Sequence, residues 1–319
     1  MHRRNLFVSL IMLVVTAVAL TTASYAWFVS NVAVTVTGLE INVTAAEGIQ
    51  VSTDAVNWRA TLSISDIIDP GEEYPNHTNQ VPTTLEPVST IGVVDDEEPG
   101  AFSFFDGFLV EGAETTLTTT AAAAEAAGTE GNYVAFDLFI RSGSELDIYL
   151  ESPSGIVYVP VDEEETVGLE WASRIGFLYQ GTQSDYDASD ARALFDGTSA
   201  DQTIFEPNAR THTALAISAG ANPGQVETYY GVKAAGEGLH FDDPLWGDFD
   251  EFFEEVTTLT VDTDDPTYQI IEANRLFTIG AGISKVRIYI WIEGQDIDCE
   301  NSISHGLGNV AASITFMLD

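Results

Sequence analysis

The stretch Lys285-Val-Arg-Ile-Tyr-Ile-Trp-Ile-Glu293 alternates branched apolar residues with aromatic and charged ones. Val286, Ile288, Ile290 and Ile292 fall on one face, and Arg287, Tyr289 and Trp291 fall on the other. A period of two is typical of a β-strand, because successive side chains of an extended chain point to opposite faces. The segment Val310–Leu318 repeats this pattern near the end of the chain. Both segments are therefore predicted to be strands that bury one face in a core.

Two further segments with the same period lie in the middle of the chain. Tyr133–Arg141 and Leu146–Glu151 are separated by the turn-forming residues Ser142-Gly143-Ser144, and this arrangement predicts a β-hairpin. Shorter apolar runs predict additional strands at Leu39–Ala45, Ile49–Ser52, Ala101–Val110, Ile156–Val161 and Leu169–Tyr179. The fold class that follows is all-β, with the strands arranged as a β-sandwich.

The segments between these strands are expected to be acidic loops and one short helix. Ile67–Glu86 is rich in Pro and Asn and is predicted to be a long surface loop, and Thr115–Gly128 is predicted to be an exposed insertion of low complexity. A single helical turn is expected within Ala188–Phe195. Asp243 suits a helix N-cap and Pro244 the first helical position, so a helix is predicted over Pro244–Val256.

The charge of the chain is its most extreme property. It carries 50 acidic against 11 basic residues, for a net charge of −39. Such a field repels nucleic acid and anionic lipid, so neither is an expected partner of the folded domain. The single cysteine, Cys299, excludes an internal disulfide. Of the two lysines, Lys285 at the head of a strand is the candidate for an isopeptide cross-link to a carboxylate.

Sequence motifs for catalysis or nucleotide binding are absent from the 319 residues. There is no G-x-G-x-x-G, H-E-x-x-H, C-x-x-C or G-x-S-x-G pattern, and no enzymatic activity is expected. The chemical hypothesis that remains is calcium binding by clustered loop carboxylates, since calcium takes six to eight oxygen ligands. Asp185, Asp187 and Asp190 lie within six residues and are the candidate ligands, although the segment does not match the EF-hand pattern and also suits a solvated run of charge.

The N-terminus has the three parts of a secretory signal. His2, Arg3 and Arg4 precede the apolar run Leu6–Leu20, and the small residues Ser24 and Ala26 place the cleavage site before Trp27. Residues 1–26 are thus predicted to be a signal peptide and residues 27–319 a single secreted β-sandwich domain. The alternative is that the helix is retained, because the 24 residues Leu6–Val29 carry no charge and are long enough to span a bilayer.

This N-terminal arrangement resembles the TasA/camelysin family of secreted matrix-fibre subunits. The resemblance rests on Ser24-Tyr25-Ala26 followed by Trp27-Phe28, and on the alternating segment behind it, in which Val32, Val34 and Val36 share one face. It implies a jelly-roll-like fold, cleavage by a dedicated signal peptidase, and an extracellular or cell-surface fibre made of copies of the chain. In such a fibre the segment Trp27–Thr37 would be the donor strand that completes a neighbour's sheet.

A second class of function is a binding module that stays on the membrane through an uncleaved, pilin-like helix. In that case the ligand would be a carbohydrate or calcium, and exposed aromatic residues such as Trp58 or Trp171 would form the sugar platforms. A strictly monomeric protein that binds cell-wall glycans would favour this alternative.

Overall fold

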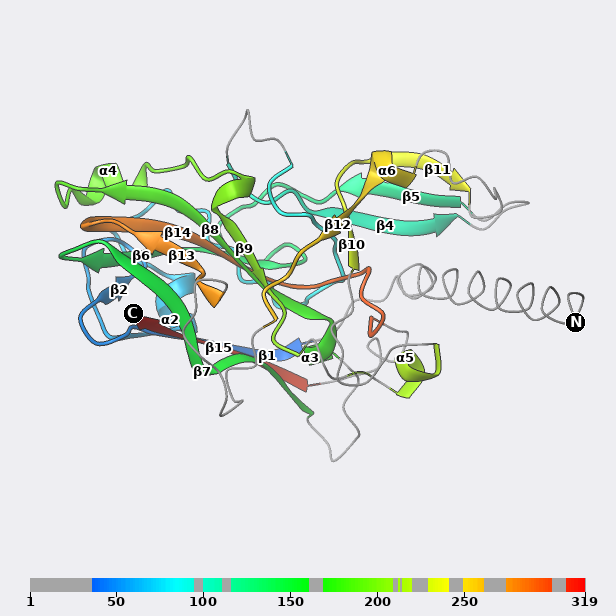
Figure 1. The fold of residues 1–319 in the computed structure, drawn as a ribbon, viewed down its shortest axis with the longest axis horizontal. Helices are drawn as coiled ribbons and strands as arrows, with labels where there is room; N and C mark the ends of the chain where they lie inside the picture. The colour runs from blue at the N-terminus through cyan, green and yellow to red at the C-terminus, as the bar shows by residue number, and fades with distance from the viewer. Residues whose placement is uncertain are drawn as a thin grey trace, which may run out of the picture.

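Two five-stranded sheets form the body of the protein in a computed structural model, which describes residues 36–94, 100–110, 116–160, 169–208, 212, 214–219, 229–240, 249–260, 274–299 and 308–318. The first sheet has the order β13-β7-β15-β1-β3 (Figure 1). Its strands are β13 (Phe277–Ile279), β7 (Leu146–Pro160), β15 (Gly308–Leu318), β1 (Val36–Thr44) and β3 (Thr61–Ser63). All its pairs are antiparallel except β1 with β15, which is parallel.

The second sheet is antiparallel throughout and has the order β2-β6-β14-β8-β9. Its strands are β2 (Gln50–Ser52), β6 (Val134–Ser142), β14 (Gly282–Ile292), β8 (Ser173–Gln183) and β9 (Gln202–Phe205). The central strand β14 contains the alternating segment that begins at Lys285, and all of its residues are buried. The strands predicted at Lys285–Glu293 and Val310–Leu318 are therefore confirmed, as β14 and β15.

The main core lies between the two sheets. It is built from the apolar face of each, with Phe136, Leu138, Val286 and Ile288 from the second sheet and Leu150, Ala312, Ile314 and Phe316 from the first, all at most 1% exposed. An apolar face on each sheet is what period-two alternation supplies. The prediction of an all-β protein with buried alternating faces is therefore confirmed.

The predicted hairpin between residues 133 and 151 is wrong, although both of its strands exist. β6 pairs with β2 and β14, and β7 pairs with β13 and β15, so residues 143–145 carry the chain from one sheet to the other. Alternation defines the face that a strand buries but not its neighbour. Two apolar faces can meet either side by side in one sheet or across the core, and here they meet across the core.

The outer face of the second sheet is covered by a second apolar cluster. Phe102, Phe104 and Tyr133 pack against Tyr289 and Trp291: Phe102 stacks on Tyr289 with ring centroids 4.4 Å apart, and Phe104 meets Trp291 edge-on at 5.5 Å. The segment Ile67–Glu86, predicted to be a surface loop, is partly buried instead: Ile67, Val81 and Leu85 belong to the main core, and the backbone of Gln80 pairs with Ala135 of β6. Apolar residues of this segment fill the core between the sheets, and that burial explains the correction.

Two smaller sheets lie beside the large ones, to the right of them in Figure 1. One has the order β11-β5-β4, formed by Gly236–His240, Thr116–Ala121 and Phe105–Val110, and the other pairs β10 (Tyr229–Val232) with β12 (Phe253–Val256). Part of the segment Thr115–Gly128 is thus a strand rather than an exposed insertion. Thr residues are favoured in strands, and pairing on both sides outweighs the lack of large apolar residues.

The described helices are all short. They are α2 (Ile64–Ile68), α3 (Leu169–Ala172), α4 (Ala188–Arg192), α5 (Ala214–Ala219), α6 (Phe249–Phe252) and the 3₁₀ turn η1 (Ser199–Asp201). The expected turn near Ala188 is α4. The helix predicted over Pro244–Val256 is wrong in its second half, since Phe253–Val256 is β12, and residues 244–248 lie outside the described residues. Within the described ranges, no helix combines the length and hydrophobicity that a bilayer crossing requires.

Candidate functional site

The first described strand, β1, occupies an interior position of its sheet. It runs parallel to β15, from Leu39 opposite Val310 to Thr44 opposite Thr315, and antiparallel to β3 on its other side. Of the predicted donor-strand residues, Val36 begins β1 and pairs with Gly308. Val32 and Val34, together with the predicted cleavage residues Ser24, Ala26 and Trp27, lie outside the described residues.

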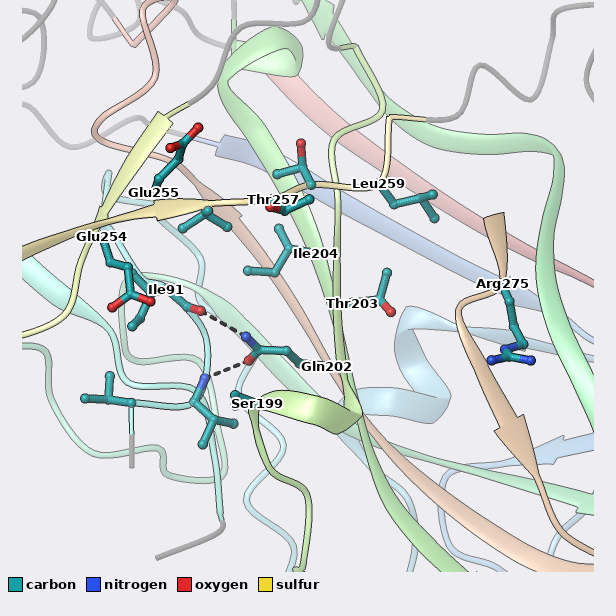
Figure 2. Close-up of a pocket in the computed structure, with 14 residues that line it drawn as sticks. Ile91, Ser199, Gln202, Thr203, Ile204, Glu254, Glu255, Thr257, Leu259 and Arg275 are labelled. Carbon is teal, nitrogen blue, oxygen red and sulfur yellow. Dashed lines mark hydrogen bonds between the residues drawn. The ribbon is translucent and has the colours of Figure 1, made fainter. Parts of the chain in front are cut away.

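A cavity of about 540 Å³ lies against β9, the edge strand of the second sheet (Figure 2). Its base is β9 together with Ser199, and its sides are the segment Glu254–Leu259, the loop Ile91–Val94 and Arg275. Gln202 fixes one wall, because its Nε2 donates to the carbonyl of Ile91 at 3.1 Å and its Oε1 accepts from the backbone N–H of Val93 at 2.8 Å. The cavity is therefore a built feature of the sheet edge and not a gap left by loose side chains.

The described lining of this cavity has the character of a binding site. It combines apolar side chains with hydroxyl groups and with the charges of Glu254, Glu255 and Arg275, and it holds no histidine or cysteine. A volume of this size is within the usual range of about 300–1,000 Å³ for ligand sites. No group in this described lining is placed as a nucleophile beside a base.

A buried ionic network joins β6 and β14 on the outer face of the second sheet. Arg287 Nη1 lies 2.9 Å from Asp137 Oδ1, and Lys285 Nζ lies 3.3 Å from Asp137 Oδ2. Burial alone would raise the pKa of the Asp137 carboxyl, but the charges of Arg287 and Lys285 hold it below its ordinary value. Tyr74 adds a hydrogen bond from its hydroxyl to Asp137 Oδ2 at 2.7 Å.

The surroundings of Lys285 bear on the predicted isopeptide cross-link. Its Nζ also donates to the carbonyls of Arg192 and Leu194, both at 3.0 Å, so three acceptors surround the group. An ammonium has three N–H donors to match them. Amide formation requires a neutral amine and a neutral carboxyl, whereas this arrangement favours the ion pair with Asp137. The lysine is placed beside a carboxylate, as the hypothesis requires, in a geometry suited to structural pairing.

A second ionic network links β8 to the segments that directly follow β9 and β14. Arg174, 1% exposed, contacts Asp296 and lies with its Nη2 3.0 Å from Glu206 Oε1. Burial raises the pKa of Glu206, and the charge of Arg174 opposes that shift. Burial likewise raises the pKa of Glu293 to about 7, although Ser89, Trp291 and Gln295 donate hydrogen bonds to it. These groups lie outside the cavity described above.

The candidate calcium ligands have local structural roles. Asp187 is the N-cap of α4, and its Oδ1 accepts from the backbone N–H of Asp190 at 3.0 Å. Asp190 Oδ2 accepts from Gln183 Nε2 at 3.2 Å, and the backbone N–H of Asp185 donates to Gln183 Oε1. Among the residues that the structure describes, no three His, Cys, Asp or Glu side chains gather as a metal site. Helix capping thus accounts for the spacing of Asp187 and Asp190.

The two tryptophans considered as sugar platforms are only partly accessible. Trp58 is half-buried, with the guanidinium of Arg141 stacked 4.7 Å from its ring centroid, and Trp171 is half-buried in α3. The Arg141 guanidinium therefore covers one face of the Trp58 ring, which a sugar platform would need open.

Sequence reasoning missed the cavity and both ionic networks. One signal for the networks was present: Asp137, Arg174 and Arg287 interrupt strands that are otherwise apolar or aromatic, and a charge at such a position needs a buried partner. The cavity had no comparable signal, because its residues come from four separate segments. Comparisons of the chain with protein-family models, with curated proteins and with solved structures find no match.

Proposed function

We propose that this protein is a structural subunit of an extracellular fibre or cell-surface matrix, in which the N-terminal segment of one copy completes a sheet of the next. The mature chain would begin at Trp27. The observation that carries the proposal is the position of β1, directly behind residues 27–35. In the sequence, residues 27–35 carry no charge and alternate from Val32 onward, a pattern that predicts a strand.

The topology supports a jelly-roll-like arrangement for the subunit. Successive strands from β6 onward pass from one large sheet to the other: β6, β8 and β14 belong to the second sheet, and β7, β13 and β15 to the first. The exception is β9, which follows β8 in the second sheet. Interleaved strands of this kind are a feature of double-sheet jelly rolls. The parallel pairing of β1 with β15 departs from a purely antiparallel jelly roll. It places the first and last described strands next to each other.

The charge of the chain favours assembly by strand addition. Removal of residues 1–26 takes away Arg3 and Arg4 and no acidic residue, so the net charge changes from −39 to −41. Copies with such a charge repel one another at long range. Main-chain hydrogen bonds between strands do not depend on side-chain charge, so they can hold subunits together where complementary charged patches are scarce.

The first test is deletion of residues 27–35, which leaves β1 and its pairing with β15 intact. We expect the deleted chain to fold with an unchanged unfolding midpoint and to form no fibres by electron microscopy or sedimentation. Fibres formed by the deleted chain would rule out the donor-strand mechanism.

A matched pair of double variants tests the face of the donor strand. Val32→Asp with Val34→Asp places charge on the face expected to be buried, and Ala33→Asp with Thr35→Asp places the same charge on the opposite face. We expect the first pair to prevent fibre formation and the second to weaken it by less. Equal effects would show that the segment does not assemble as a strand with one buried face.

The intact mass of the protein recovered from cells or medium tests the cleavage. We expect the mass of a chain that starts at Trp27. A chain that retains Leu6–Leu20 would support the alternative of a membrane-anchored module or a pilin-like helical core, and the donor strand would not be free to exchange.

A further inference from the structure

The edge of β9 that faces the cavity has backbone groups available for another strand. Leu259 already pairs with the end of β9 in parallel orientation: its N–H donates to the Ile204 carbonyl at 2.7 Å, and Glu206 N–H donates to its carbonyl at 2.9 Å. In a strand, the N–H and C=O of one residue point to the same side, and alternate residues share a side. The Ile204 N–H and the Gln202 C=O therefore also point away from β8. Neither has a partner in the part of the chain that the structure describes.

The cavity lies where a strand paired with this edge would run. Figure 2 looks toward β9 with Ile204 directed to the side where Ile91 and Glu254 lie, and Thr203 directed to the other side, toward Arg275. On the first side Ile91, Val93 and Val256 offer apolar surface beside Glu254 and Glu255, and on the second side lie Thr203, Leu259 and Arg275. An added strand would send alternate side chains to these two sides. The site therefore suits a segment with one face of branched apolar residues and one face of small or polar residues.

Charge restricts the occupant further. Glu254 and Glu255 stand at the cavity in a chain of net charge −39, so an acidic segment would be repelled. From Asn5 to Leu39 the chain carries no charged residue, and within this stretch the segment of residues 27–35 combines strand alternation with Val32 and Val34 on one face and Ala33 and Thr35 on the other. A cavity of about 540 Å³ can hold a few residues of extended chain but not a folded domain.

We propose that the Gln202–Ile204 edge of β9 is the acceptor site for residues 27–35 of a second copy of this chain. This inference rests on the proposed fibre function and adds the place where the donor strand binds. The incoming strand would bond to the Ile204 N–H and the Gln202 C=O, continue the line begun by Leu259, and insert Val32 or Val34 beside Ile91 and Val256.

A pair of tryptophan variants separates the acceptor site from fibre formation itself. Val94 lines the cavity and is 40% exposed, and Val56, which is 42% exposed, lies outside the lining. Val94→Trp would fill the space needed by the incoming strand, and Val56→Trp adds the same bulk elsewhere. We expect Val94→Trp to lower the rate of fibre elongation at least tenfold and Val56→Trp to assemble like the wild type, with thermal unfolding showing that both fold.

Photo-cross-linking provides a second measurement that does not depend on the folding of a cavity variant. A benzophenone amino acid in place of Ala33, on the face opposite Val32 and Val34, mixed with isotope-labelled copies, reports which residues of the neighbour the segment contacts. We expect cross-links between copies to residues 199–204 or 254–259. Cross-links elsewhere, or equal elongation by Val94→Trp and wild type, would overturn this acceptor site while the fibre function stands. A wild-type chain that forms no fibres would instead refute the proposed function.

Discussion

Asp137 is the residue on which the outer face of the second sheet depends electrostatically. Its two carboxylate oxygens pair with Arg287 and Lys285, and all three side chains are at most 6% exposed. A buried charge is tolerated only while it is paired, and loss of one partner of such a pair usually costs about 3–5 kcal/mol. Asp137→Asn is therefore expected to lower the free energy of unfolding by roughly that amount, as measured by urea or guanidinium titration.

The matched control is Glu254→Gln, which removes the carboxylate that lies 3.4 Å from the ammonium of Lys233. In that pair the glutamate side chain is 57% exposed, so solvent screens the interaction. Loss of the exposed ion pair is expected to cost about 1 kcal/mol or less. Equal losses in the two variants would show that the Asp137 network is not the desolvated cluster described here.

Glu293 gives the stability of the protein an unusual dependence on pH. Burial raises its pKa to about 7 from 4.5, so the folded state holds its proton at pH values where the unfolded state has lost it. Below pH 4.5 both states hold the proton and the free energy of unfolding is highest with respect to this group. As the pH rises from 4.5 toward 7, the free energy of unfolding falls, and above pH 7 it falls no further on account of Glu293. The size of the decline is on the order of 3 kcal/mol, because one pKa unit corresponds to about 1.4 kcal/mol.

Glu293→Gln tests this dependence. The variant is expected to have nearly the wild-type stability at low pH, because an amide and a protonated carboxyl are both neutral and similar in shape. As the pH rises from 4.5 to 7, the stability of the wild type should fall relative to that of the variant, which does not titrate. A difference that stays constant over this window in denaturant titrations would contradict the raised pKa.

Among the single elements, α4 is stabilised by one carboxylate at its N-terminus. Asp187 caps its first turn, and Asp190 lies in that same turn, where the helix dipole favours negative charge. Asp187→Ala is expected to lower stability by about 1 kcal/mol, the usual effect of losing an N-cap. The loss should be the same in EGTA and in millimolar calcium, measured as the shift in thermal midpoint.

Calcium binding by the Asp185–Asp190 loop would give a different result. The wild type would then be stabilised by calcium, and Asp187→Ala would lose that response. This comparison distinguishes the capping role seen in the structure from the metal site suggested by the clustering of carboxylates.

The strands illustrate which properties of an element are local. The positions of β6, β7, β14 and β15 follow from alternation that is visible in the sequence. Their partners do not, because any two strands with an apolar face satisfy the same pattern. β12 shows the opposite case: the pattern around Phe249, Phe252, Phe253 and Val256 fits a helix, yet residues 253–256 pair with β10. Tertiary pairing outweighs a weak local preference interrupted by Gly247.

For the molecule as a whole, the net charge governs how copies approach one another. Repulsion between acidic subunits is screened over about 10 Å at 0.1 M salt and about 3 Å at 1 M. Fibre elongation, followed by light scattering, is therefore expected to become faster as sodium chloride rises from 0.05 to 1 M. As a control, the unfolding midpoint of the chain that lacks residues 27–35 should change little over the same range of salt. Slower elongation at high salt would indicate that attraction between charges drives assembly.

Local patterns in the chain were enough to predict the fold class, the strands with one apolar face and the acidic character of the protein. These properties follow from local periodicity and from composition, which need no knowledge of neighbours. The N-terminal pattern of Arg3, Arg4, Leu6–Leu20 and Ser24–Ala26 is likewise a local signal, and the secretion that it predicts remains a prediction.

Only the tertiary structure decided which strands are neighbours, which loops are buried and where the cavity lies. The cavity combines residues near positions 91, 202, 256 and 275, and the partners Asp137 and Arg287 are 150 residues apart. The physical reason is that burial and pairing depend on contacts between distant segments, which no local pattern encodes. The open edge of β9 is a property of the whole sheet, because a strand is an edge only when every other strand has found its place.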